Sequence, residues 1–417
     1  MNTFRQRHGL PILFISGLCF WSGITILLPT LPLYIQSIGG TKQQIGLVMG
    51  AFSIGLLPSR FGLGPLADAK GRKLVLIIGA GVATLAPLAY LSAQSIAPLF
   101  GIRAFHGISI AAFTIGFSAL VADLAPVMRR GEVIGQMGLV NPIGMAIGPA
   151  IGGFVEAAAG YPLLFLISAT FGGLSLVGVS QVWEPPRHHV VPNQPEFSKP
   201  ETQKNGLEQF FEYFKLIFHP ALRTPAFVLL NVGLIFGTLV TFLPLSIQES
   251  GLNFNAGLFY SAAAIASFTS RLFVGRASDR RGRGMFITLG LVFYLLSMLV
   301  LAMVPDRTTL LAAGVLEGAG AGIVIPTMLA LITDRCQPEA RGQFFSLCLG
   351  GFDMGLALAG PIFGWITAQV GYQNTYLVNA ILALTAILAF MLQSNQTVKH
   401  SLLFSMGQTR DGYKIEP

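Results

Sequence analysis

The chain has 417 residues, of which 53% are hydrophobic and only 11% are charged. Soluble domains carry about 25% charged residues, so this chain lacks the polar surface that a water-soluble enzyme of its length would need. Its formal net charge is +8. The basic residues sit in short loops and form no clustered face, so the sequence does not indicate nucleic acid as a partner. The positive charge indicates contact with anionic membrane lipid instead.

Apolar segments follow one another along most of the chain, separated by charged or turn-rich breaks. A membrane-spanning helix needs about 20 apolar residues, and the segments reach that length. They predict an all-α membrane protein with twelve transmembrane helices, at 10–36, 44–64, 74–93, 97–122, 132–157, 161–183, 224–248, 256–275, 285–304, 308–332, 343–369 and 372–393.

The placement of Lys and Arg predicts the orientation of these spans. Only Lys42 and Arg307 fall in loops after odd-numbered spans, and Arg60, Arg103 and Arg271 lie within spans or near their ends. The remaining basic residues fall at the termini or in loops after even-numbered spans, which are cytoplasmic by the positive-inside tendency. Both termini are therefore expected to be cytoplasmic.

The apolar pattern is interrupted once, between the sixth and seventh spans. Residues 184–222 open with prolines and polar residues, which predicts a cytoplasmic linker. The end of this linker has apolar residues at helical spacing, typical of an amphipathic helix in the membrane interface. The expected domains are a six-helix bundle over 1–183, this linker, a second six-helix bundle over 223–395 and a cytoplasmic tail over 396–417.

The two halves of the chain are copies of each other. An offset of 211 residues aligns 64–72 with 275–283 and Asp123 with Asp334, and an offset of 212 aligns Gly148-Pro149 with Gly360-Pro361. Each half has an even number of predicted spans, so the repeats are parallel. In transporters with such repeats the substrate path lies between the halves and opens alternately to each side.

The repeated loop combines two glycines, an acid and a base: Gly64, Asp68, Gly71 and Arg72 in the first copy, and Gly275, Asp279, Gly282 and Arg283 in the second. Glycine permits close approach and tight turns, and aspartate can pair with a basic group or with a helix N-terminus on the facing bundle. This combination suits a gate, and residues 64–72 and 275–283 are called the first and second gating loops below. The alternative is that the loop charges serve only topology.

Two spans carry further patterns of small residues and prolines. These are Gly23, Pro29 and Pro32 in the first span, and Gly144, Gly148, Pro149, Gly152 and Gly153 in the fifth. Small residues four apart let helix backbones touch, and proline can bend a helix. The spacing by itself indicates a closely packed face.

Together these features resemble the major facilitator superfamily over nearly the whole chain. The first-span pattern is similar to the helix-1 signature of twelve-span drug:proton antiporters, and the fifth-span pattern matches the antiporter motif of that branch. The resemblance implies that the gating loops hold one state closed on the cytoplasmic side. It also implies that the antiporter motif favours outward transport and limits proton leak.

Four ionisable residues at membrane depth are candidates for proton coupling or for the substrate path: Arg103, His106, Glu317 and Asp353. Buried charges in a membrane are costly and usually face a cavity or a partner. Arg103-x-x-His106-Gly107 resembles the helix-4 motif of the family, with His106 in place of the usual glutamine. The alternatives are structural: Asp353 can pair across the seam between the second and eleventh spans. Arg60 and Arg271 can either snorkel to the interface or pair with Asp68 or Asp279.

The function expected is proton-coupled export of small amphipathic or hydrophobic molecules by alternating access. The alternative is uptake of a sugar or other metabolite by symport or facilitated diffusion; a receptor or a membrane-embedded enzyme is less favoured. No metal spacing, catalytic motif or nucleotide loop is present, so no cofactor and no enzyme activity is expected. The expected protein is a monomeric, multi-pass protein of a bacterial inner membrane whose partners are the substrate, protons and lipid.

Overall fold

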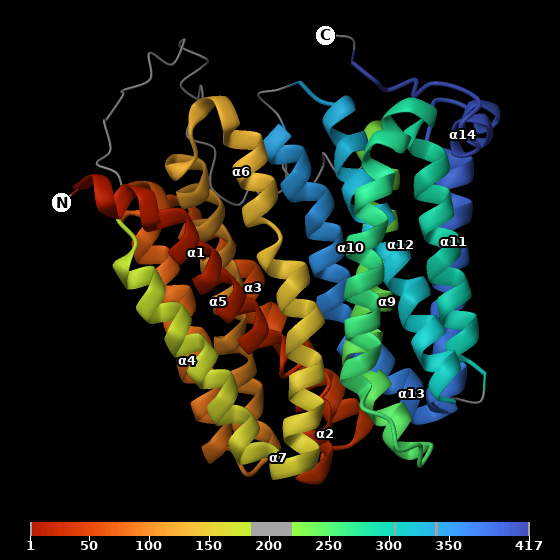
Figure 1. Cartoon of the computed structure of the whole chain (residues 1–417). Helices are drawn as coiled ribbons and strands as arrows, with labels where there is room; N and C mark the ends of the chain where they lie inside the picture. The colour runs from red at the N-terminus through yellow and green to blue at the C-terminus, as the bar shows by residue number, and fades with distance from the viewer. Residues whose placement is uncertain (1, 185–218, 304–305, 338–340, 416–417) are drawn as a thin grey trace, which may run out of the picture.

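The computed structural model describes residues 2–184, 219–303, 306–337 and 341–415, and nearly all of these residues are helical (Figure 1). The predicted amphipathic helix of the linker lies outside the described residues. The helices of the first half are α1 (Asn2–Thr25), α2 (Leu31–Ser37), α3 (Lys42–Lys70), α4 (Arg72–Ser92), α5 (Ile96–Leu124), the 3-10 turn η1 (Val127–Arg129), α6 (Arg130–Met137) and α7 (Val140–Gln181).

The second half follows the same order of long helices. It consists of α9 (Pro220–Glu249), α10 (Ala256–Arg281), α11 (Arg283–Leu301), α12 (Arg307–Asp334), α13 (Arg341–Gln393) and the short α14 (Val398–Ser405). The tail expected over 396–417 therefore contains a helix that the sequence reasoning missed.

Within the described residues, nine helices are long and apolar enough to cross a membrane, and Gly9–Thr25 is a shorter apolar helix. Two of the nine are each a pair of helices that meet at a kink. Gly160 in α7 has φ +74° and Gly371 in α13 has φ +78°, a conformation that glycine adopts without strain. Both kinks fall at predicted boundaries between spans.

The helices pack into two groups that meet along two seams. In the first group α1 packs on α7, and α5 packs on α3 and α4; in the second group α9 packs on α13, and α12 packs on α10 and α11. The seams between the groups are α3 with α13 and α7 with α10. A path between the halves is therefore bounded by these four helices.

Equivalent contacts hold each half together. A Cβ on Gly107 of α5 would overlap the backbone oxygen of Phe52 in α3, and a Cβ on Gly318 of α12 would overlap that of Ala263 in α10. Both residues of the second contact lie 211 positions after those of the first, so the sequence repeat is also a repeat of packing. Close backbone contact of this kind needs glycine.

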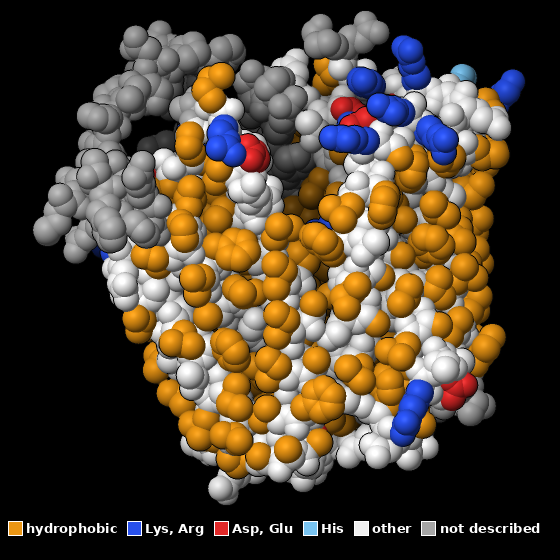
Figure 2. Space-filling model, in the orientation of Figure 1, with side chains coloured by type: hydrophobic (Ala, Val, Ile, Leu, Met, Phe, Trp, Pro, Cys, Tyr) orange, Lys and Arg blue, Asp and Glu red, His pale blue; other side chains and the backbone are white. Residues whose placement is uncertain are grey.

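The outer surface fits a membrane. Hydrophobic side chains cover the visible sides of the molecule, and Lys and Arg gather at the end where the chain termini lie (Figures 1 and 2). This end is called the basic end below, and the opposite one the far end.

Candidate functional site

The two seams are tightly closed towards the far end. On one seam a Cβ on Gly46 of α3 would overlap the backbone oxygen of Gly360 in α13; on the other, a Cβ on Gly257 of α10 would overlap that of Pro149 in α7. Each residue of one contact has its repeat equivalent, 211 positions away, in the other contact. The two seams are therefore built alike and touch backbone to backbone.

One helical turn further along, the seams remain in contact. A Cβ on Gly50 would lie 2.9 Å from the backbone oxygen of Ala357. At the equivalent point of the other seam the Ser261 hydroxyl donates a hydrogen bond of 2.5 Å to the backbone oxygen of Ala146. An ion pair joins the halves at the same end, with Lys42 Nζ 3.2 Å from Glu249 Oε2.

Towards the basic end the described residues no longer cover these helices in the same way. No described atom of another element lies within 4 Å of a Cβ built on Gly64 of α3, Gly275 of α10 or Gly350 of α13. Gly64 and Gly275 lie 18 residues after Gly46 and Gly257, which is five helical turns, so each is on the same helix face as the closed contact. Figure 2 shows a hollow between the two helix groups at this end.

Arg60 and Asp353 form an ion pair across the α3–α13 seam. Arg60 Nη1 lies 2.8 Å from Asp353 Oδ2, between the closed far end and the uncovered glycines. The interpretation of Arg60 as a partner of Asp68 or Asp279 is therefore wrong, because α13 brings a carboxylate nearer. The equivalent of Asp353 in the first half is Asn141 at the 212-residue offset, so only one seam carries a carboxylate here.

The fifth-span motif bridges two neighbouring helices. Its residues Gly144, Gly148 and Gly152 face the end of α1 and the turn after it, where a Cβ on each would contact Trp21, Thr25 and Ile26 respectively. The Thr25 hydroxyl donates a hydrogen bond of 2.9 Å to the backbone oxygen of Gly144.

The remaining motif residues, Pro149 and Gly153, face α10, and a Cβ on Gly153 would overlap the Asn255 amide oxygen. One motif thus fixes both the packing inside the first half and the α7–α10 seam.

The first-span motif shapes a break in the first span. Gly23 lies close to α7, and its backbone oxygen accepts a hydrogen bond of 2.7 Å from the Ser168 hydroxyl. The helix then ends at Thr25, and α2 resumes at Leu31 with Pro32 in its first turn. Pro29 lies in the connecting turn, where its missing N–H costs no helical hydrogen bond.

The gating loops form the same ionic arrangement in both halves. In the first, Arg72 Nε lies 2.9 Å from Asp123 Oδ2 and Arg72 Nη2 lies 4.0 Å from Asp68 Oδ1. In the second, Arg283 lies 2.5 Å from Asp334 and 3.1 Å from Asp279. The turns are made by Gly71 at φ +125° and Gly282 at φ +95°.

Sequence reasoning aligned Asp123 with Asp334 but did not place them in the gating loops, and it missed Glu184 altogether. The Glu184 carboxylate accepts hydrogen bonds from the backbone N–H of Arg72 at 2.9 Å and of Lys73 at 3.3 Å. A carboxylate at a helix N-terminus is stabilising, so Glu184 anchors the beginning of α4. The sequence feature that could have indicated this role is that Glu184 is the first acidic residue after the sixth span.

Arg103 and His106 lie together inside the first half. The Arg103 guanidinium lies 4.4 Å from the centre of the Phe52 ring, and His106 Nδ1 lies 3.3 Å from the Tyr90 hydroxyl. Both residues are buried. Arg103 Nε and His106 Nε2 make no hydrogen bond with the described residues.

Glu317 occupies the equivalent position to His106 on α12 and is also buried. No ion pair of Glu317 is found within the described residues. The structure does not pair Glu317 with Arg103, so the four candidates form three separate places: the Arg103–His106 cluster, Glu317, and the Arg60–Asp353 pair.

Comparison with known families identifies one match over nearly the whole chain. The profile of the Major Facilitator Superfamily matches residues 13–305 and 257–405. Similar proteins include Multidrug resistance protein MdtG of Serratia proteamaculans, 27% identical over 89% of this chain and 91% of the relative. The Multi-drug resistance efflux pump PmrA homolog of Lactococcus lactis is 28% identical with the same two coverages.

A third relative and two solved structures extend the comparison. The Staphylopine export protein of Staphylococcus aureus is 24% identical over 91% of this chain and 95% of the relative. The fold is similar to that of a bacterial homologue of the lysosomal transporter Spinster, with a TM-score of 0.75, 16% identity and coverage of 95% and 98% of the two chains. A mutant of the nucleoside transporter NupG gives a TM-score of 0.71 at 17% identity, with coverage of 93% and 99%.

Proposed function

Because the chain belongs to the Major Facilitator Superfamily and is an integral multi-pass membrane transporter, we propose that it exports small amphipathic or hydrophobic molecules by alternating access. The names of the relatives support export, since two are multidrug resistance proteins and one is an export protein. Their bacterial sources support the inner membrane as its location.

The observation that carries this proposal is the contrast between the two ends of the seams. Backbones touch at Gly46–Gly360 and Gly257–Pro149, whereas Gly64, Gly275 and Gly350 are uncovered. With twelve spans in two six-helix bundles and cytoplasmic termini, the uncovered end faces the cytoplasm. The structure then corresponds to an inward-open state that receives substrate from the cell interior, and one chain supplies the whole path as a monomer.

The fifth-span motif favours export over uptake. Its glycines hold α7 against α1 and against α10, so it stiffens the seam at the closed end. A tightly sealed seam limits leakage of protons through a protein that works against a gradient. Uptake of a sugar or other metabolite remains the competing function, and the transport experiment below separates the two.

We assign proton coupling to Glu317 and Asp353, with Arg103 and His106 as the polar path in the first half. Glu317 is buried without an ion pair within the described residues, whereas Asp353 is paired with Arg60 across the seam. A carboxyl group that changes partners as the halves move can gain and lose a proton. Proton exchange at Asp353 would therefore be linked to opening of the seam.

Transport into inside-out membrane vesicles with an imposed pH gradient tests the function. We expect pH-driven uptake of hydrophobic dyes and drugs into the vesicles, and Glu317→Gln and Asp353→Asn to abolish it while the protein stays folded. Glu132→Gln, which removes an exposed carboxylate of the Arg129 pair, is the matched control. Full pH-driven activity in both variants would disprove the coupling assignment, and transport of a sugar without any hydrophobic compound would disprove export.

A further inference from the structure

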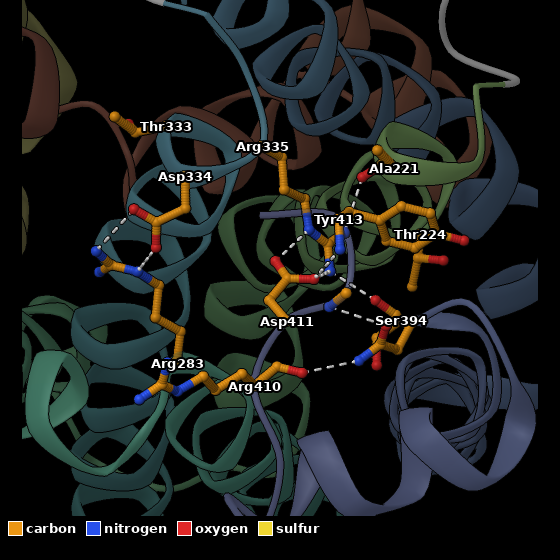
Figure 3. Close-up of polar contacts among 12 residues, drawn as sticks. Ala221, Thr224, Arg283, Thr333, Asp334, Arg335, Ser394, Arg410, Asp411 and Tyr413 are labelled. Carbon is orange, nitrogen blue, oxygen red and sulfur yellow. Dashed lines mark hydrogen bonds and ion pairs between the residues drawn. The ribbon is translucent and has the colours of Figure 1, made fainter. Parts of the chain in front are cut away.

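Arg335 is an arginine in an unusual position, at the C-terminal end of α12 with a fully buried side chain. A buried charge is tolerated only when it is paired and hydrogen-bonded. The Arg335 guanidinium lies 2.7 Å and 3.0 Å from the two carboxylate oxygens of Asp411 and donates to the backbone oxygens of Ala221 and Ser394 (Figure 3). It thereby joins the ends of α9, α12 and α13 to the last part of the chain.

Asp411 belongs to a segment that we name the C-terminal strap, residues 398–415. The strap is α14 followed by a stretch of turns and bends that returns across the basic end. Asn395 fixes the last part of the strap in place. Its side chain accepts a hydrogen bond of 3.0 Å from the Gly412 N–H and donates one of 3.2 Å to the Arg410 backbone oxygen. The Tyr413 ring lies 5.1 Å from the Arg335 guanidinium.

The strap also reaches the second gating loop. The Ile415 N–H donates a hydrogen bond of 3.0 Å to the backbone oxygen of Asp334, whose carboxylate binds Arg283. On the other side of that loop, a Cβ on Gly284 would overlap the backbone oxygen of Phe404 in α14. The strap therefore contacts the first turn of α11, directly after the loop, and also Asp334, the acidic residue that binds Arg283 of the loop.

Among the residues that the structure describes, the first half shows a different arrangement. The residue that corresponds to Arg335 is Leu124, and the beginning of α4 is anchored by Glu184 instead. The two gating loops thus have matching ion pairs but different supports. The first is tied to Glu184, just after α7, and the second to the segment after α13.

We propose that the C-terminal strap positions the second gating loop and stabilises the state that is open at the basic end. With the strap docked, Arg283 is held by Asp279 and Asp334 of its own half and is not available to the facing half. Release of the strap frees this loop to close the basic end. Arg335 and Asp411 are positioning residues in this role. The inference rests on the alternating access of the proposed function, but not on its substrate or direction.

The test measures how open the basic end is, without measuring transport. Gly350→Cys, introduced after the three native cysteines are replaced by alanine, places a thiol at a position of α13 that no described neighbour covers. Its rate of reaction with a water-soluble maleimide reports the population open at the basic end. We expect Asp411→Asn to slow labelling by about fivefold, at the low end of typical coupling between sites, because the released loop favours closure.

Two further variants separate positioning from simple stabilisation. Ile415→Pro removes the N–H that donates to the Asp334 backbone oxygen and does not alter the charge. Because the Ile415 side chain is exposed, we expect little change in melting temperature. We expect slower labelling of the Gly350→Cys thiol. Glu132→Gln is the control for loss of a carboxylate at the basic end and should leave labelling unchanged. Labelling of Asp411→Asn and Ile415→Pro at the control rate or faster would overturn the proposal, whatever their melting temperatures.

Discussion

Arg60 and Asp353 are charged residues in apolar helices, and each finds its partner in the other half of the chain. The sequence placed both at membrane depth. It offered pairing across the seam between the second and eleventh spans for Asp353, but snorkelling or pairing with Asp68 or Asp279 for Arg60. Packing of α3 on α13 resolved the choice. A membrane makes an unpaired charge costly. Arg60 therefore pairs with the buried carboxylate across the seam rather than with a carboxylate in a loop that water can solvate.

Removing one partner of this pair should lower the stability of the folded protein more than removing both partners. We expect Asp353→Asn to lower the melting temperature because it leaves Arg60 without its carboxylate, and Arg60→Gln combined with Asp353→Asn to restore part of the loss. Coupling energies of contacting residues are about 0.5–3 kcal/mol. A double-mutant cycle of melting temperatures in detergent measures this coupling, and strictly additive effects would show that the pair contributes nothing.

Asp306, at the far end, makes a pH-dependent contribution to the stability of the folded protein. Its carboxylate accepts hydrogen bonds from the Thr308 hydroxyl at 2.7 Å and the Thr309 N–H at 2.8 Å, and these lower the pKa of Asp306. Because the folded pKa is depressed, the stabilisation is present above the unfolded value of about 3.9 and is lost as the pH falls through the folded pKa.

The variant Asp306→Asn keeps an acceptor at the start of α12 but cannot titrate. We expect it to melt below the parent protein at pH 7, and this gap to shrink as the pH falls below the unfolded value of about 3.9 and through the lower folded pKa. Melting curves at a series of pH values measure the gap. A gap of constant size would show that the carboxylate charge makes no contribution.

At the level of helices, the seams depend on glycine where backbones meet. Gly46 and Gly257 each allow a helix to touch the opposite half, and the repeat places them at equivalent positions. The repeat was evident from the sequence, but the choice of neighbours was not. Small residues four apart indicate close packing without identifying the helix that packs there.

A larger side chain at Gly46 should therefore push the far end open. Overpacking costs about 1–3 kcal/mol, and about 1.4 kcal/mol corresponds to a factor of ten, so Gly46→Val is expected to shift the balance of states about five- to hundredfold. Labelling of the Gly350→Cys thiol measures this shift as slower reaction. Gly62→Val on the same helix, where no neighbour lies within 4 Å, is the control and should label at the parent rate; equal rates for both would contradict the seam assignment.

For the molecule as a whole, alternating access requires the far end to separate. Ser261 and Ala146 touch across the α7–α10 seam, so a disulfide between Ser261→Cys and Ala146→Cys should arrest transport until a reductant is added. The control is the similar contact of Ser297 with Ala313, which lies within the second half. A disulfide there should leave transport intact, and continued transport in the Ser261–Ala146 disulfide would exclude rocking about this seam.

The sequence alone was sufficient for the membrane class, the helix boundaries at Gly160 and Gly371, the internal repeat and the repeated loop motif; the gating role of that motif stays a prediction. These features depend on local hydropathy, on turn-forming residues and on periodicity, which are properties of neighbours along the chain. The number of spans and the proton-carrying residue stay predictions.

Only the tertiary structure decided that Asp353 pairs with Arg60, that Glu184 anchors α4 and that the last residues fold back onto Arg335 and the second gating loop. Each of these contacts joins residues more than 70 positions apart. Many acids and bases along the chain could form such contacts equally well by type, and packing alone determines which of them meet.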